Sequence, residues 1–284
     1  MDAKKVGKTI SFLRKYYGMT QKELADRLGV TDKAVSKWEQ GRGVPDISLL
    51  AKISVVLDTD IESILEGNLT HLELNWKGII SMEYSHEINA DASFFGIRSV
   101  YLQTSFLMLA GIKEICIRGI EHDIDIARRE LGDGSAYGLQ IAYENTDALN
   151  IIDTLNSEFF KKSQNDGYGV MIINGLDFLY GKDVTKYFRR VIYGSKYPVR
   201  LVNFKRRPTS IYFFPDTIET AKCLEGNITK HIRAQVLERG VITFPIKTLD
   251  DSLDASMMIR VLEKHQEESV SNLSEIAVRR GFVI

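Results

Sequence analysis

The stretch of residues 20–41, TQKELADRLGVTDKAVSKWEQG, constrains the fold more than any other part of the chain. Its apolar residues recur at helical spacing and are expected on one buried side: Leu24, Ala25, Leu28, Val30, Val35 and Trp38. Gly29 interrupts this pattern and tolerates the positive φ of a tight turn. The stretch therefore predicts two short helices joined by a tight turn.

Polar residues at the expected helix starts agree with this division. Thr20 is a suitable N-cap residue, and Glu23 three positions later completes a capping box for the first helix. Either Thr31 or Asp32 caps the second helix, which is expected to end at Gly41.

Apolar stripes on both sides of this pair predict three further helices. Residues 6–17 carry one such stripe, with lysine and arginine elsewhere. Pro45 and Asp46 open a fourth helix, and Asp60 caps a last short one. Five helices with short links predict a compact all-α domain, of the five-helix lambda-repressor-like kind, at residues 1–66.

The exposed side of the second helix of the pair has a chemistry that suits a DNA major groove. It carries short polar groups and two lysines, namely Thr31, Asp32, Lys33, Ser36 and Lys37. A lysine donates to guanine O6 and N7, and an aspartate accepts from cytosine N4. The net charge of the whole chain is −1, but residues 1–52 hold eleven Lys and Arg against six Asp and Glu. The basic balance therefore lies where the two-helix pattern lies.

With these motifs, residues 5–66 resemble the Xre-type (Cro/C1) helix–turn–helix family of bacterial and phage regulators, including Trp38-Glu39-x-Gly41 and the following Pro45. The resemblance implies base-edge contacts from Asp32, Lys33, Ser36 and Lys37. It also implies phosphate contacts from Gln21, Thr31 and Arg42. Two alternatives stay open, because Asp32 would serve equally as an N-cap and Arg42 as a solvated loop charge.

A different pattern follows residues 67–75, which lose the helical period and predict a linker. From Trp76 onward, short apolar runs alternate with amphipathic helical stretches. This predicts an α/β Rossmann-like domain with a mostly parallel sheet at residues 76–284. The expected strands are 77–81, 114–117, 139–143, 169–173, 199–204, 211–214 and 241–244. The expected helices include 92–110, 123–131 and 149–160.

Several motifs of this second domain resemble the sugar-1-phosphate nucleotidyltransferases of the glucose-1-phosphate thymidylyltransferase type. In the family's order they are KGII at 77–80, LMLAGIKEICI at 107–117, LGDGSAYGLQIAY at 131–143, YGKDV at 180–184 and the closing segment 255–283. The resemblance implies a nucleotidyltransferase-type fold over most of the domain.

The phosphate-binding loop of that family is not kept. Where a glycine-rich loop and its arginine belong, the chain has MEYSHEINAD at 82–91. Glu83 and Tyr84 stand in place of glycines, and Ile88 stands in place of the arginine. A phosphate loop needs small residues so that its amides can approach the anion, and a glutamate there repels it.

The metal and sugar ligands of the family are replaced as well. Leu176 and Pro245 stand where two magnesium-binding aspartates belong, and Asn227 stands at the sugar-binding glutamate. Asp177 lies one position further on, where a strand end is expected to direct it elsewhere. Because phosphoryl transfer relies on cations and a metal, we predict a degenerate domain without catalytic, cofactor-binding or metal-binding residues.

The cysteine content and the hydrophobicity of the chain indicate the cellular compartment. The two cysteines, Cys116 and Cys223, lie among apolar residues and are expected to be buried thiols in a reducing compartment. The most apolar run, 106–110, is far too short to span a membrane, and the N-terminus does not resemble a signal peptide. A cytoplasmic protein without a membrane partner is expected.

The sequence therefore favours a transcriptional regulator that binds a near-palindromic double-stranded DNA operator as a homodimer or higher homo-oligomer. Its degenerate second domain is expected to mediate dimerisation, sensing of a nucleotide-sugar-like effector, or both. The alternative is an active sugar-1-phosphate nucleotidyltransferase that carries a DNA-binding domain, with Asp177 as a displaced metal ligand.

Overall fold

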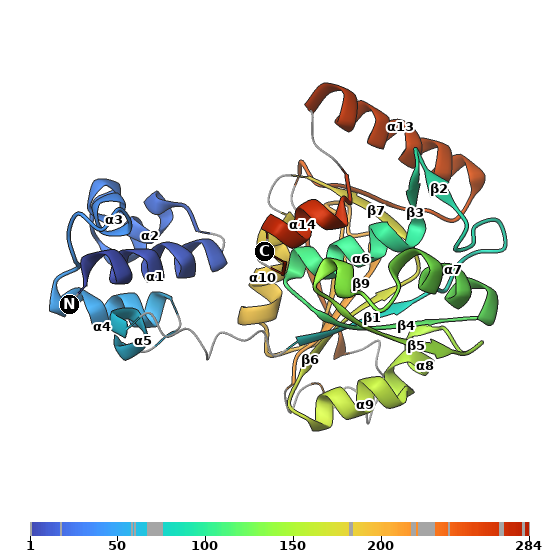
Figure 1. Cartoon of the computed structure of the whole chain (residues 1–284), viewed down its shortest axis with the longest axis horizontal. Coiled ribbons are helices and arrows are strands. Elements are labelled where there is room, and N and C mark those ends of the chain that lie inside the picture. The colour runs from blue at the N-terminus through green and yellow to red at the C-terminus, as the bar shows by residue number, and fades with distance from the viewer. Residues whose placement is uncertain are drawn as a thin grey trace. The chain divides into compact units, whose positions relative to one another are not determined.

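The computed structural model describes residues 2–17, 19–57, 59, 61–66, 76–181, 184–216, 220, 231–237, 239–266, 270–279 and 282–283. The chain divides into two compact units, Met1–Leu74 and Asn75–Ile284, each with its own hydrophobic core (Figure 1). The predicted linker at 67–75 lies outside the described residues.

The described part of the first unit contains five helices, as predicted. They are α1 Ala3–Tyr16, α2 Gln21–Leu28, α3 Asp32–Glu39, α4 Ile47–Val56 and α5 Ile61–Glu66. The capping box of Thr20 and Glu23 is present at the start of α2, and Gly29 ends that helix with a φ of 73°. The predicted turn chemistry is confirmed at these three residues.

The first helix starts earlier than predicted. It begins at Ala3, not at residue 6, because the side chain of Asp2 accepts the backbone N–H of Lys4 at 2.9 Å and so caps it. The predicted cap at Asp60 lies outside the described residues.

The core of the first unit forms from one buried stripe on each helix. Its members are Val6, Ile10, Leu13, Met19, Leu24, Ala25, Leu28, Val35, Trp38, Leu50, Ile53, Leu57 and Ile64. The helices α1 and α3 approach so closely that a Cβ added to Gly7 would lie 2.0 Å from the Trp38 carbonyl oxygen. Glycine is required at that position because any side chain would push the two helices apart.

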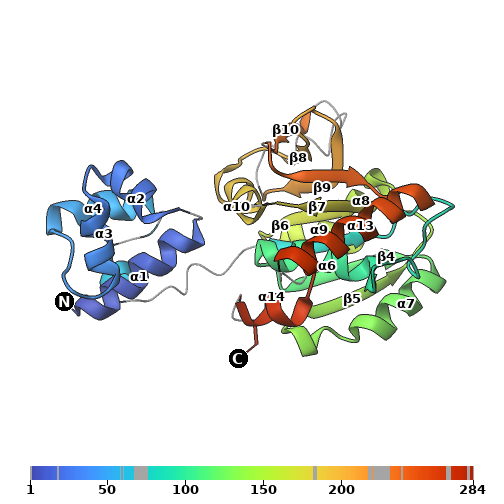
Figure 2. The ribbon, with the colours of Figure 1, turned by 90° about the horizontal axis from the view of Figure 1, so that it is seen from above.

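The second unit is built on a seven-stranded sheet with the order β10-β8-β9-β6-β1-β4-β5 (Figure 2). Its strands are β1 Trp76–Ser81, β4 Glu114–Gly119, β5 Gln140–Asn145, β6 Gly169–Asn174, β8 Val199–Val202, β9 Pro208–Phe214 and β10 Arg233–Val236. Only β9 runs antiparallel to its neighbours, β6 and β8. The predicted α/β class with a mostly parallel sheet is therefore confirmed.

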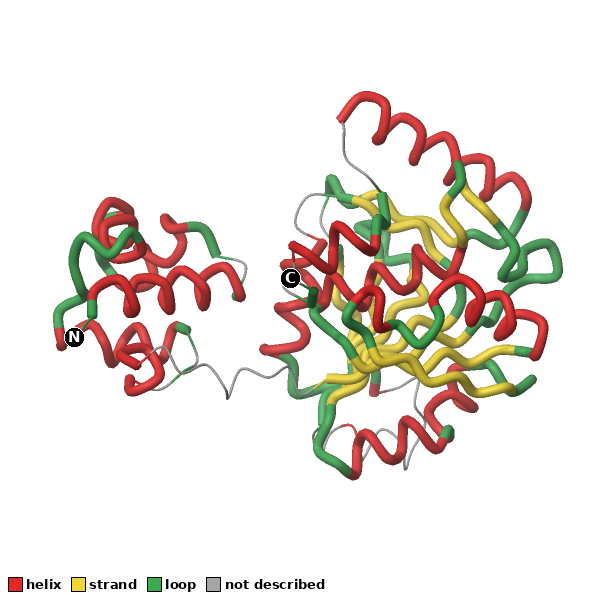
Figure 3. Tube along the Cα trace, in the orientation of Figure 1, coloured by secondary structure: helices red, strands yellow, loops and turns green. Residues whose placement is uncertain are grey.

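Helices cover both faces of this sheet, with the strands between them in Figure 3. One face carries α8 Ile151–Asn156 and α9 Glu158–Asn165, whose Leu155 and Phe160 pack on Ile79. The other carries α6 Ser99–Ala110, α7 Glu121–Leu131, α10 Val184–Gly194 and α14 Leu273–Arg279 (Figure 1). Gly78, next to Ile79, faces Leu107 of α6, as the alternation of a strand requires.

Two predicted helices of this unit are wrong in part. Residues 92–98 do not open α6 but form a hairpin of β2 Ser93–Phe94 and β3 Ile97–Arg98, turned by Phe95 and Gly96 at positive φ. The stretch 149–160 is split by Ser157, which ends α8 and caps α9 through its side chain.

One strand prediction also needs correction, and two strands were missed. The strand expected at 199–204 ends at Val202, because Asn203 accepts backbone N–H groups of the following turn. The strands β7 Asp177–Tyr180 and β10 Arg233–Val236 were not expected. β7 pairs with β11 Ile242–Pro245 in a separate two-stranded sheet.

A second hydrophobic cluster joins these small sheets to α13 Leu249–Gln266. Its buried members are Ile88, Phe94, Leu102, Leu176, Phe178, Ile246, Ala255, Ile259 and Leu262. Cys116 is buried as predicted, and burial raises the pKa of its thiol to about 12, while Cys223 lies outside the described residues. No helix among the described residues is long and apolar enough to cross a membrane.

Candidate nucleic-acid interface

A buried ion pair fixes α3 against the two helices before it. The Arg14 guanidinium on α1 binds Glu39 at the end of α3, with Nη2 and Oε2 2.9 Å apart, and it also donates to the Met19 carbonyl at 2.6 Å. Gln21 at the start of α2 donates from Nε2 to Glu39 Oε2 at 2.7 Å. Glu39 therefore joins α1, α2 and α3 in one fixed arrangement.

The carboxylate of Glu39 is held in its ionised form. Burial alone would raise its pKa, but the hydrogen bonds from Arg14 and Gln21 and the charge of Arg14 outweigh burial and lower the pKa below its ordinary value. The support of α3 is therefore strongest when Glu39 carries its negative charge.

The N-terminus of α3 shows which of Thr31 and Asp32 caps this helix. Thr31 is the N-cap, because its hydroxyl accepts the backbone N–H of Ala34 at 3.2 Å. Asp32 is instead the first helical residue and is exposed, with its carboxylate accepting the N–H of Lys33 at 2.8 Å. α3 ends at Glu39, two residues before the predicted end at Gly41.

The side chains predicted to touch DNA lie together on and beside α3. Asp32, Lys33 and Lys37 are exposed, and Ser36 is half-buried and accepts a hydrogen bond from Gln40 at 3.1 Å. The stem of Lys37 passes close to Gly43, which leaves its ammonium group at the surface.

The predicted phosphate contacts flank this group. Thr31 and Arg42 are exposed at the two ends of α3. Gln21 is half-buried and uses one amide proton on Glu39, so one N–H remains for a phosphate. Four of the seven residues lie on α3 and Gln21 contacts its last residue, Glu39, although the contact of all seven residues with DNA stays a prediction.

Residues 10–64 match the family described as Helix-turn-helix, HTH_3. The N-terminal unit is a helix–turn–helix domain. A relative for this part of the chain is a prophage-derived HTH-type transcriptional regulator, YonR, of Bacillus subtilis, which is 28% identical over 94 residues. This match covers 29% of the present chain and 87% of the relative.

Beyond the helix–turn–helix domain, the carboxyl end of β1 is filled by a tyrosine. The Tyr84 hydroxyl donates to Gln103 Oε1 at 2.8 Å, and Gln103 Nε2 donates to the Gly175 carbonyl at 2.8 Å. Gln103 is fully buried on α6. Burial raises the pKa of Tyr84, so its hydroxyl stays neutral and donates.

Next to it, a buried arginine occupies the end of β4. The Arg118 guanidinium donates to Thr154 Oγ1 and to Glu144 Oε1, both at 3.0 Å. Thr154 in turn lies 3.2 Å from the Ser81 hydroxyl at the end of β1. Ligands of open α/β sheets bind outside the carboxyl ends of the strands, and here those ends carry the chain's own side chains.

The residues at the expected metal positions do not fit a magnesium ion. Leu176 packs in the hydrophobic cluster with Phe178, and Pro245 has no side-chain oxygen. Asp177 points away from Leu176, is buried, and accepts the backbone N–H of Ser210. Burial raises the pKa of Asp177. Among the described residues, no group of three His, Cys, Asp or Glu side chains could hold a metal.

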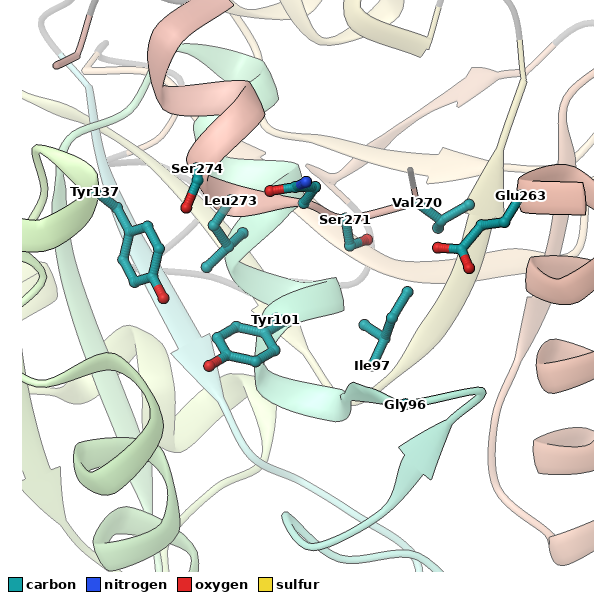
Figure 4. A pocket seen from close by; sticks show the side chains of 10 residues that line it. Gly96, Ile97, Tyr101, Tyr137, Glu263, Val270, Ser271, Leu273 and Ser274 are labelled. Carbon is teal, nitrogen blue, oxygen red and sulfur yellow. The ribbon is translucent and has the colours of Figure 1, made fainter. Parts of the chain in front are cut away.

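A pocket of about 300 Å³ lies elsewhere in the second unit. Its walls come from β3, α6, the short 3-10 helix Ser135–Tyr137, the last turns of α13, residues 270–272 and the start of α14. The lining residues are Gly96, Ile97, Tyr101, Tyr137, Glu263, Val270, Ser271, Asn272, Leu273 and Ser274. Figure 4 shows Tyr137 and Tyr101 on one side and Glu263 with Val270 on the other.

The second unit is similar to glucose-1-phosphate thymidylyltransferases. The enzyme of Mycolicibacterium smegmatis is 28% identical over 230 residues, a match that covers 65% of this chain and 79% of the enzyme. A Bacillus anthracis structure assigned to the same enzyme class superposes with a TM-score of 0.52 at 14% identity, covering 65% of this chain and 95% of that one. The nucleotidyltransferase-like fold is therefore shown.

Two buried residues at the filled strand ends of the second unit were not anticipated from the sequence. Arg118 was missed because the strand before it was expected to end at Ile117, which left the arginine in a loop. Gln103 lies in an apolar helix, and a lone glutamine among buried residues was the signal that could have revealed it.

Proposed function

We propose that this chain is a sequence-specific DNA-binding transcriptional regulator. The observation that carries the proposal is the exposed face of α3, where Lys33 and Lys37 are exposed while the hydrogen bonds of Glu39 hold the other end of the helix in the bundle. A helix held in this way can present its side chains to base edges without further ordering.

The second unit, in this proposal, keeps the nucleotidyltransferase fold but does not catalyse. Three features support this view. Tyr84 and Arg118 fill the carboxyl ends of β1 and β4, Leu176 and Pro245 offer no metal ligand, and Asp177 binds the chain's own backbone. A fold alone does not imply activity.

Self-association is the first role we assign to the second unit. A single helix–turn–helix domain makes few base contacts, whereas two of them read half-sites about 34–36 Å apart on one face of the duplex. A dimer therefore binds a near-palindromic operator much more tightly than a monomer does.

Effector sensing is the second role, and the pocket of Figure 4 supports it. Its tyrosine hydroxyls, serines and one carboxylate match the hydroxyl groups of a sugar-like ligand. Thermal-shift measurements with nucleotide sugars test this role, since a ligand that binds the folded state raises the melting temperature. Tyr101→Ala serves as the pocket variant in the same measurements. If no ligand of the panel changes the melting temperature of the original chain, sensing is removed from the proposal.

The DNA-binding proposal is tested by affinity for operator DNA at increasing salt. We expect the association constant to fall steeply with salt, because phosphate contacts release counterions. The variant Lys33→Ala with Lys37→Ala should lose about tenfold or more in specific affinity, whereas Lys52→Ala, an exposed lysine on α4, should change it little. Specific binding that survives the double substitution would contradict the proposal.

The enzymatic alternative has its own experiment. Pyrophosphate release from a nucleoside triphosphate and a sugar 1-phosphate is measured with magnesium, on the whole chain and on Asp177→Ala. We expect no release from either. Magnesium-dependent release that is lost in Asp177→Ala would establish an active nucleotidyltransferase.

A further inference from the structure

The helix α13 lies at the outside of the second unit (Figure 1). It carries a stripe of exposed apolar side chains. Leu249, Leu253, Met257 and Val261 follow one another at four-residue spacing and are 65%, 63%, 58% and 52% exposed. The opposite side of the same helix packs into the core through Ala255, Ile259 and Leu262. A helix that is apolar on both sides usually buries both.

The four exposed charges beside this stripe are divided by sign at Met257, whereas the half-buried Asp251 accepts backbone N–H groups at the helix start and the half-buried Glu263 lines the pocket. Asp250 and Asp254 lie before Met257, and Arg260 and Lys264 lie after it. All four are exposed, and none has an ion-pair partner among the residues that the structure describes. We call the eight residues of the stripe and its flanking charges the outer face of α13.

We infer that the outer face of α13 pairs with the same face of a second copy of this chain, antiparallel, about a two-fold axis at Met257. In such a pair, residues at equal distance before and after the axis face each other. Asp254 then faces the partner subunit's Arg260, and Asp250 faces the partner subunit's Lys264. Leu253 meets the partner subunit's Val261, and Met257 meets its own copy.

This self-complementarity is what selects a second copy as the occupant. A different protein would need only a matching surface of its own, and nothing would require acidic and basic residues to be placed symmetrically about one position of α13. The inference rests on the proposed function, because it names the surface by which the regulator dimerises.

The helix dipole also favours acidic residues near the start of a helix and basic residues near its end. The charge pattern could therefore reflect either the helix dipole or pairing with a second copy. Asp254 and Arg260 distinguish these two explanations, since they lie in the middle turns of α13, where the dipole has little effect. Changing these two charges therefore reports on pairing.

The test is a charge exchange followed by sedimentation equilibrium of the full chain. Asp254→Arg and Arg260→Asp each place two like-charge pairs in the dimer, and each should raise the dissociation constant about tenfold. The double variant restores both attractions and should dimerise like the original chain. Mixing the two single variants should also restore dimers, because each supplies the charge that the other lacks.

Two further variants examine the apolar stripe. Met257→Glu should give monomers, whereas Ile152→Glu, at an exposed isoleucine on α8 with similar exposure of 54%, should leave the dimer intact. Circular dichroism of each variant shows that it is folded. Met257→Cys should form a disulfide between copies on mild oxidation, since this residue meets itself at the axis.

The outcomes separate the inference from the proposed function. Dimers that persist unchanged in Asp254→Arg, Arg260→Asp and Met257→Glu would overturn the role of α13 while leaving a dimeric regulator. Loss of dimers in both single variants without recovery on mixing would also overturn it, and would point to a different occupant. A chain that is monomeric at all concentrations would overturn both the inference and dimerisation, and the salt dependence of DNA binding would still test the regulator separately.

Discussion

The hydroxyl of Tyr84 donates a 2.8 Å hydrogen bond to Oε1 of the buried Gln103, just beyond the end of β1. The amide of Gln103 continues the chain of bonds to the Gly175 carbonyl after β6. A loop that cradles phosphate would present free backbone amides at this place. Here the Tyr84 side chain occupies this place, and the hydrogen bonds of Tyr84 and Gln103 connect the end of β1 with the end of β6.

Removing the Tyr84 hydroxyl should destabilise the second unit. In Tyr84→Phe, Gln103 loses the donor to its buried oxygen, so we expect the free energy of unfolding to fall by about 1–2 kcal/mol. Urea denaturation measures this. Tyr168→Phe is the matched control, because no hydrogen bond of its hydroxyl is seen among the described residues, and an equal loss there would contradict the role given to Tyr84.

A fall in pH should lower the free energy of unfolding of the helix–turn–helix domain, because Glu39 becomes protonated. Its pKa is lower in the folded state than the ordinary 4.5, so its stabilisation is present above that value and is lost as the pH falls through the lowered pKa. Unfolding followed by Trp38 fluorescence in a Trp76→Phe background measures this. Glu39→Gln should lose about 2 kcal/mol at neutral pH and most of the pH dependence in this range. An unchanged pH profile would show that the ion pair with Arg14 contributes nothing.

Asp177 should give the opposite pH dependence in the second unit. Burial raises its pKa in the folded state, so the free energy of unfolding falls as the pH rises from the ordinary 3.8 to the raised value. Asp177→Asn can still accept the Ser210 N–H but carries no charge. We expect this variant to be at least as stable as the original chain at neutral pH, by urea denaturation. A marked loss of stability there would mean that the ionised carboxylate is required.

Gly7→Ala should damage the bundle by separating α1 from α3. The added Cβ would lie 2.0 Å from the Trp38 carbonyl oxygen, a contact that backbone atoms cannot relieve without movement. We expect a loss of about 3 kcal/mol and weaker DNA binding, by denaturation and by titration with operator. Gly29→Ala has open space around it and only its positive φ to oppose the change, so it should cost about 1 kcal/mol.

Local chemistry explains which parts of the fold were predictable from sequence. The caps at Thr20 and Glu23 and the turn at Gly29 depend on neighbours within a few residues, and the structure has them as predicted. The long buried strands were equally clear because apolar runs are bounded by turn residues. The hairpin at 93–98 and the strand β7 were missed, since two to four residues become strands only when a distant partner pairs with them.

In the candidate sites, too, features that depend on near neighbours in the sequence were predictable, and contacts between distant residues were not. Asp32, Lys33, Ser36 and Lys37 lie on one helix, as the local spacing predicted, whereas Gln21 reaches the end of α3 through its hydrogen bond to Glu39, a contact between two helices. In the second unit, sequence comparison indicated which ligands were replaced. It could not show that Tyr84 reaches Gln103, or that Arg118 is buried between Thr154 and Glu144, because these contacts join residues far apart in the chain.

The helix α13 borders three environments at once. Ile259 holds it in the hydrophobic cluster, Glu263 lines the pocket of Figure 4, and Met257 points outward on the surface. A small molecule that moves Glu263 would therefore also move the outer face of α13, which we infer pairs with a second copy. By thermodynamic reciprocity, dimer formation would then alter the affinity of the pocket by the same factor that the molecule alters dimer formation. One helix would in this way couple the concentration of a small molecule to the fraction of the protein that is dimeric.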